Sequence, residues 1–151
     1  NNENKDKLLL KDMERFQCLM FDSMNKYESR IPILVLSGID KFNAALKIQK
    51  YKNEFESEFP SFQYLIDDEK DETMPYHEQA LEHIKNQYLM IFDTNLQNGS
   101  IHCKCAKKKR LQPQKLFIKT INNINDMNEV QRVWNKLNKA LIHGNIMHEL
   151  R

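Results

Sequence analysis

The feature that most limits the fold of this chain is a short apolar segment at residues 33–36, enclosed between Pro32 and the pair Ser37-Gly38. Four consecutive apolar residues between two turn signals are typical of a strand that is buried on both faces. Before this strand, residues 8–27 carry apolar side chains at three- and four-residue spacing, which predicts an amphipathic helix. A helix that leads directly into a buried strand favours a parallel sheet.

Helical and strand patterns continue to alternate along the chain. Residues 39–59 return to helical spacing until Pro60, and residues 76–88 do so again. The acidic run at residues 67–72 between them predicts a solvated loop. The apolar run at residues 116–121 predicts another strand. This order favours an α/β fold, with a mostly parallel central sheet flanked by helices.

Three shorter segments are expected to add strands. Residues 62–66 and residues 89–93 each form a short, mostly apolar run that is expected to be a strand. Asn98 and Gly99 both tolerate positive φ, which predicts a hairpin turn between the second of these runs and residues 101–105. The sheet is therefore expected to contain both parallel and hairpin-connected strands.

The last segment of the chain predicts a helix with defined ends. Asn123 or Asn125 is expected to cap its first turn, because a short polar side chain there accepts a bond from a free backbone N–H group. Gly144 is expected to end it. Trp134, Leu137 and Leu141 lie on its apolar stripe, and we assign them to a partner interface, although a core position explains the same pattern.

Bulk properties predict one domain over residues 1–151. The chain has 40% hydrophobic and 29% charged residues with 3 Gly and 4 Pro, which argues against a disordered or low-complexity chain. Its 3 cysteines are odd in number, which favours reduced thiols in an intracellular protein. The sequence has no apolar run of the roughly 18 residues that cross a bilayer, so no membrane contact is expected.

The charge is distributed unevenly along the chain. Between Thr94 and Asn125 there are seven basic residues and no acidic residue. Clustered basic side chains neutralise successive phosphates and release counterions, which gives a salt-dependent affinity for nucleic acid. A solvated loop or a nuclear import signal explains the same run. We assign DNA contact to five of these residues, namely Lys104, Lys107, Lys108, Lys109 and Arg110.

No complete catalytic or metal site is recognised in the sequence. His102, Cys103 and Cys105 are close enough to suggest zinc, but no fourth ligand is apparent. A metalloprotease helix beginning at His77-Glu78 would need histidine at position 81, where Leu81 stands. We therefore predict no catalytic residue, no metal and no cofactor.

Six segments of the chain match, in order, the helices and strands of one known family. They are residues 17–18, 24–27, 30–38, 80–84, 116–120 and 128–134. Together they resemble the nuclease domain of XPF-type structure-specific endonucleases, in which a helix leads to a strand of the form ILVIEG or VLLIEF. The resemblance spans about residues 8–142. It implies an XPF nuclease-like fold.

The departures from that family imply a protein that has lost its catalytic site. Active members carry a GDxxxERKxxxD motif before the first helix, whose carboxylates hold a divalent metal. Only Glu3-Asn4-Lys5 precedes the helix here, and Ser37 stands where that family has a strand-end glutamate. The tandem helix-hairpin-helix module that usually follows in that family is not expected here. The resemblance therefore implies a pseudonuclease.

The function that this resemblance implies is binding without cleavage. The chain would pair with an ERCC-like subunit as a heterodimer, bind branched or junction DNA, and promote meiotic recombination and crossover formation in the nucleus, on chromosomes. Among the family's non-catalytic members it looks most like a fungal meiotic crossover factor of the ZMM group, or the inactive partner of a Mus-type nuclease. Two alternatives stay open. One is an active magnesium-dependent endonuclease whose metal-binding strand lies outside this chain, and the other is a protein-interaction scaffold without DNA contact.

Overall fold

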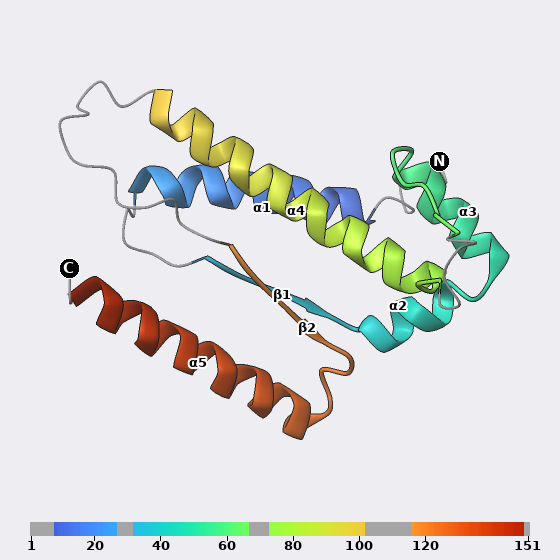
Figure 1. Cartoon of the computed structure of the whole chain (residues 1–151). Helices are drawn as coiled ribbons and strands as arrows, with labels where there is room; N and C mark the ends of the chain where they lie inside the picture. The colour runs from blue at the N-terminus through green and yellow to red at the C-terminus, as the bar shows by residue number, and fades with distance from the viewer. Residues whose placement is uncertain (1–7, 27–31, 67–72, 102–115, 150–151) are drawn as a thin grey trace. The chain divides into compact units, whose positions relative to one another are not determined.

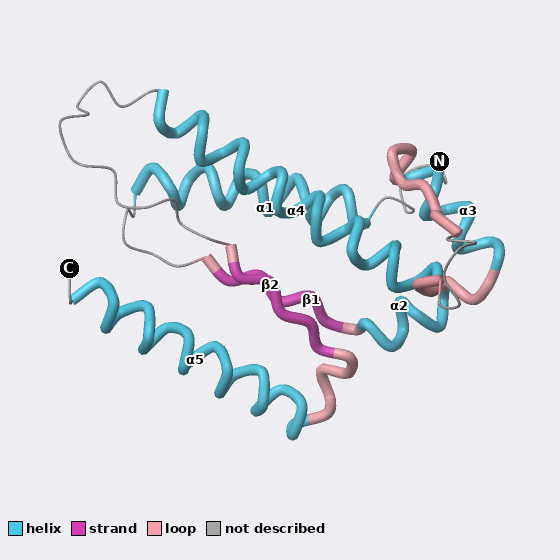
Figure 2. The backbone as a smooth tube through the Cα atoms, viewed as in Figure 1, coloured by secondary structure: helices cyan, strands magenta, loops and turns pink. Residues whose placement is uncertain are grey.

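The computed structural model describes residues 8–26, 32–66, 73–101 and 116–149 (Figure 1). The chain divides into two compact units, one made of residues 1–30 and 43–114 and the other of residues 31–42 and 115–151. Helices predominate over strands in the described residues (Figure 2). The elements are α1 (Leu8–Lys26), β1 (Ile33–Ser37), α2 (Ile39–Ala45), α3 (Gln49–Glu58), α4 (Tyr76–Ile101), β2 (Phe117–Ile121) and α5 (Met127–Glu149).

The sheet belongs to the second unit, and its parallel pairing confirms the α/β prediction. β1 and β2 run parallel, in a register that starts at Ile33 beside Phe117 and ends at Ser37 beside Ile121. The sheet has two strands among the described residues. The prediction that β1 is buried on both faces is wrong, because Val35 is 41% exposed. A strand with a single described neighbour leaves one edge and part of its surface uncovered.

The single helix predicted over residues 39–59 is interrupted, so that α2 and α3 are separate helices. The backbone N–H of Lys47 donates to the oxygen of Ala44, and that of Ile48 donates to Ala45. Such three-residue bonds tighten the last turn of a helix. Ile48 then adopts an extended conformation, with φ −98° and ψ 125°, before α3 begins. Apolar spacing predicted the helical residues but missed this break.

The strands predicted at residues 62–66 and 89–93 do not form. Residues 62–66 are irregular, and α4 runs without interruption through 89–93, Asn98 and Gly99 to Ile101, so the hairpin prediction is also wrong. The buried residues of α4 explain why the helix continues, because four-residue spacing aligns side chains on one helical face. They are Ala80, Ile84, Tyr88 and Phe92, each at most 4% exposed.

The first unit has a core of helices and aromatic rings. α4 packs along α1, where the rings of Phe16 and Tyr88 meet edge to face with centroids 5.1 Å apart. A second cluster forms around Phe55, whose ring lies 5.0 Å from that of Phe59 and 5.1 Å from that of Phe62. Edge-to-face aromatic pairs add to the free energy of burial. These contacts fix the segment after α3 against the face of α4.

The last helix forms as predicted, but different residues define its ends. Asp126 Oδ1 accepts bonds from the backbone N–H groups of Asn128 and Glu129, so it is Asp126, rather than Asn123 or Asn125, that caps α5. The helix continues past Gly144 to Glu149, so the predicted stop is also wrong. No described helix has the length and apolar character needed to cross a membrane.

Candidate functional site at the carboxyl ends of the parallel strands

The second unit brings two polar loops to one edge of its sheet. Because β1 and β2 are parallel, their carboxyl ends, Ser37 and Ile121, lie side by side. Gly38 follows the first strand, and Asn122 follows the second. In α/β proteins, ligands bind outside the carboxyl ends of parallel strands. This edge is therefore the candidate functional site that the fold positions.

Gly38 shapes the turn between β1 and α2. Its φ is +75°, a conformation that side chains other than glycine rarely adopt. No atom of the described residues lies within 4 Å of the position a Cβ would occupy. The oxygen of Gly38 accepts a 3.0 Å bond from the backbone N–H of Phe42, which starts the helix. The turn is thus held by α2 on one side and open on the other.

A backbone hydrogen bond joins the two loops of this edge. The N–H of Asp40 donates to the oxygen of Asn122 over 3.3 Å. The exposed carboxylate of Asp40 accepts a 2.7 Å bond from the N–H of Lys41 through Oδ1. The first turn of α2 is therefore fixed relative to the loop after β2, and it presents an acidic side chain to solvent there.

Glu129 holds the loop that follows β2. Its two carboxylate oxygens accept bonds from the N–H groups of Asn122, at 2.8 Å, and Asn123, at 3.0 Å. Asn123 Oδ1 in turn accepts a 3.0 Å bond from the N–H of Asn125. Charged acceptors on backbone N–H groups give strong bonds. The second loop is therefore ordered by its own polar side chains.

Sequence reasoning identified the Ser37-Gly38 turn as the end of a strand but assigned it no role. It also missed Asp40 and Glu129. The available signal was positional, because polar residues that directly follow two parallel strands meet at one sheet edge. The partner of Asp40 across this edge is a backbone oxygen, which no side-chain pattern reveals.

The residues that the sequence assigned to DNA contact, Lys104 to Arg110, lie outside the described residues, so that assignment stays a prediction. On α5, Trp134 is 57% exposed and Leu137 is 5% exposed. The side chain of Leu141 lies outside the described part. The structure does not test their role in a partner interface.

The expected absence of a metal site was argued from the spacing of residues 102–105 and of residues 77–81, and the structure describes the second of these segments. His102, Cys103 and Cys105 lie outside the described residues. Elsewhere in the described part of the chain, no three His, Cys, Asp or Glu side chains are grouped so that they could hold a metal ion.

Comparison with known families overturns the predicted XPF-type resemblance. A protein-family model described as O-methyltransferase matches residues 27–142, which is more than half of the chain. No curated protein and no solved structure gives a significant match. The match includes β1, the Gly38 turn, α2, α3, α4 and β2. A short apolar strand between helices occurs in many α/β folds, so that pattern did not distinguish one family from another.

The functional predictions that depended on the XPF-type resemblance are corrected with it. The pseudonuclease assignment, and with it the absence of enzymatic activity, is wrong, because the matched family is one of enzymes. Junction-DNA binding in meiotic recombination has no support, nor have the nuclease and scaffold alternatives. The ERCC-like partner, branched DNA as a partner and the nuclear and chromosomal location are untested. The chain belongs to the O-methyltransferase family.

Proposed function

We propose that this chain transfers a methyl group to a hydroxyl oxygen of an acceptor molecule. The observation that carries the proposal is the family match over residues 27–142. The polar edge at the carboxyl ends of β1 and β2 supports it, because this is where parallel α/β sheets bind their ligands. In methyl transfer to a hydroxyl oxygen, a bond forms between the methyl carbon and that oxygen, the bond from the methyl carbon to the donor atom breaks with its electron pair left on the donor, and the hydroxyl proton is released to solvent.

The methyl donor implied for such a reaction is S-adenosylmethionine, and the residues at this edge fit it. The open space at Gly38 leaves the backbone accessible to a ligand. Ser37 is exposed and offers a hydroxyl group beside that turn. Asp40 is exposed and offers a carboxylate, the group that accepts hydrogen bonds from ribose hydroxyls in related α/β sites.

The roles of these residues follow from their chemistry. When bound, the donor supplies a methyl group on a positively charged sulfur atom. Ser37 and Asp40 would hold and orient the bound molecule by hydrogen bonds, and Gly38 would allow close approach to the backbone. The bond from Asp40 N–H to Asn122 would keep the two loops from separating. The edge thus contributes orientation, which is a large part of catalysis in bimolecular reactions.

The proposal is tested first by binding. Isothermal titration of the full chain with S-adenosylmethionine, and with S-adenosylhomocysteine as its product, should show binding of both. Asp40→Asn should weaken binding about 10-fold or more, because it removes a charged acceptor worth about 1.5–3 kcal/mol. Asp12→Asn is the matched control, since Asp12 is an exposed carboxylate on α1 and should leave the affinity unchanged.

Transfer itself is tested with donor that carries a labelled methyl group. Label should appear in hydroxyl-bearing small molecules and disappear when the acceptor oxygen is already methylated. Absence of binding for both compounds, or equal weakening by Asp40→Asn and Asp12→Asn, would contradict the assignment of the donor to this edge.

A further inference from the structure

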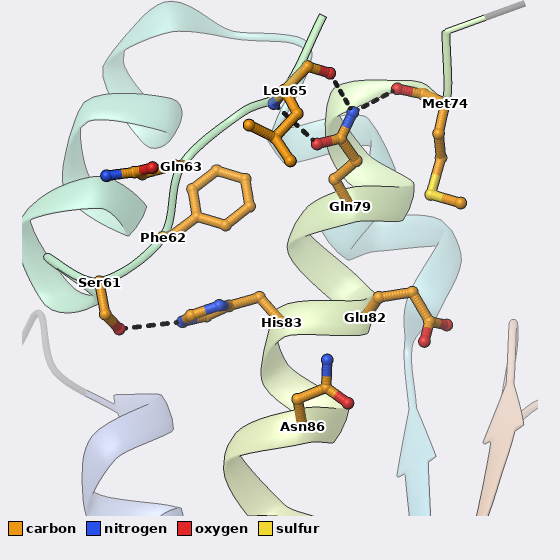
Figure 3. A pocket seen from close by; sticks show the side chains of 9 residues that line it. All are labelled: Ser61, Phe62, Gln63, Leu65, Met74, Gln79, Glu82, His83 and Asn86. Atoms are coloured by element: carbon orange, nitrogen blue, oxygen red, sulfur yellow. Dashed lines mark hydrogen bonds between the residues drawn. The ribbon is translucent and has the colours of Figure 1, made fainter. Parts of the chain in front are cut away.

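The first unit contains a pocket with a volume of about 360 Å³, formed between the segment after α3 and one face of α4 (Figure 3). This volume lies near the lower end of the range for small-molecule sites, about 300–1,000 Å³. On α4 the lining side chains are Gln79, Glu82, His83 and Asn86. Their spacing of three and four residues places them on one face of the helix. The pocket is therefore built by the fold of this unit alone.

Gln79 fixes the rim of this pocket. Its amide oxygen accepts a 3.0 Å bond from Leu65 N–H, and its amide nitrogen donates to Leu65 O, at 2.8 Å, and to Met74 O, at 2.9 Å. Figure 3 shows these three bonds converging on the one side chain. These bonds use both the oxygen and the nitrogen of the Gln79 amide, so this side chain holds the rim in place. The side chains of the two rim residues remain exposed, at 68% for Leu65 and 48% for Met74.

His83 forms an uncharged part of the wall. Its ring packs edge to face against Phe59, at 5.7 Å between centroids, and Phe62, at 5.4 Å. Burial lowers the pKa of His83, so the ring is neutral at neutral pH. The amide nitrogen of Gln87 lies 3.4 Å from His83 Nε2. The hydroxyl oxygen of Ser61 lies at the same distance from Nε2, so this ring nitrogen already faces two polar groups of the protein (Figure 3).

Two acceptor groups of the wall, on Glu82 and Asn86, can meet a hydrogen-bond donor of a ligand. The carboxylate of Glu82 accepts from Lys85 Nζ at 2.6 Å, so its charge is already paired. A carboxylate has two oxygens and several lone pairs, so it retains the capacity to accept another donor. The amide oxygen of Asn86 is a second acceptor on the same face. Phe62, Leu65 and Met74 supply apolar surface to the same pocket.

We propose that this pocket binds a small uncharged molecule with an apolar body and a hydrogen-bond donor at one end. The apolar body contacts Phe62, Leu65 and Met74, and the donor group faces Glu82 and Asn86. A charged ligand is disfavoured, because His83 is neutral and the Glu82 carboxylate is balanced by Lys85. All of its lining residues belong to the first unit, whereas Ser37, Gly38 and Asp40 belong to the second.

Ligand-observed saturation-transfer NMR on the full chain tests the proposal with three probes at pH 7.5. Indole has an apolar body and one N–H donor, 1-methylindole lacks that donor, and benzoate carries a negative charge. Indole should bind, 1-methylindole should bind about 3- to 10-fold more weakly through loss of one hydrogen bond, and benzoate should not compete. Equal binding of the two indoles would overturn the donor requirement, and competition by benzoate would overturn the preference for an uncharged ligand.

Matched variants locate the binding. Met74→Ser should weaken indole binding severalfold, whereas Met90→Ser, at a 62% exposed methionine of α4 outside the lining, should not. Glu82→Ala should remove the preference for indole over 1-methylindole, and Glu78→Ala, at an exposed glutamate one turn away, should keep it. No saturation transfer from indole, or equal effects of each variant and its control, would overturn the site. A failure here with intact S-adenosylmethionine binding would leave the proposed methyl transfer unaffected.

Discussion

Replacing Gly38 with alanine isolates the cost of a single backbone angle. Gly38 has φ +75°, and the position of an added Cβ has no neighbouring atom within 4 Å among the described residues. A methyl group there meets no steric obstacle from the rest of the described structure. The predicted loss of stability therefore comes from the local conformation alone.

The magnitude follows from two opposing terms. An L-residue in the left-handed region costs about 1–2 kcal/mol. Alanine also reduces the conformational freedom of the unfolded chain relative to glycine, which returns about 0.4–1 kcal/mol. The expected net loss for Gly38→Ala is thus about 0.8 kcal/mol, within a range of about 0–1.6 kcal/mol. Gly38→Asn should cost less, because asparagine adopts the left-handed region more readily than other non-glycine residues.

The assay is urea unfolding followed by far-UV circular dichroism, with the free energy compared at equal slope. Gly38→Ala should lower the midpoint measurably, and Gly38→Asn should fall between it and the natural chain. A Gly38→Ala chain more stable than the natural chain would refute the positive φ. A loss above about 3 kcal/mol would show that the added methyl group meets a neighbouring atom, because only a clash in addition to the backbone cost reaches that value.

Three further changes test the packing, the cap and the titration. Phe92→Ala should destabilise the first unit by about 3–5 kcal/mol in the same assay, since Phe92 is 1% exposed in its core; a loss under 1 kcal/mol would contradict that burial. Asp126→Ala should cost about 0.5–2 kcal/mol through loss of the α5 cap, while Asn125→Ala should cost little. A larger loss for Asn125→Ala would support the cap predicted from the sequence. The pKa of His83 in the folded chain is lowered below its ordinary value of 6.5. The unfolded chain therefore binds more protons than the folded chain, and the stability that the chain has above pH 6.5 is lost as the pH falls. His83→Gln should reduce this loss between pH 7 and 5, and an unchanged pH profile would contradict it.

The sequence by itself determined the elements whose patterns have one physical interpretation. The amphipathic stripe of α1 and the bounded apolar runs of β1 and β2 were found at nearly their observed positions. The parallel arrangement was also predicted, from a helix that leads directly into a short apolar strand. Of the candidate site, the sequence indicated only the Ser37-Gly38 turn at the end of a strand. The family that this strand was taken to resemble was wrong.

Only the tertiary structure decided the elements and contacts that depend on residues far apart in the chain. Residues 89–92 are apolar and fit either a strand or a helix, and the packing of α4 along α1 selects the helix. The bond from Asp40 to Asn122 and the three bonds of Gln79 join segments that share no sequence pattern. The physical reason is the same in each case. Local periodicity reports which face of an element is apolar, whereas the partner of that face, and of each polar group beside it, is fixed when the chain packs.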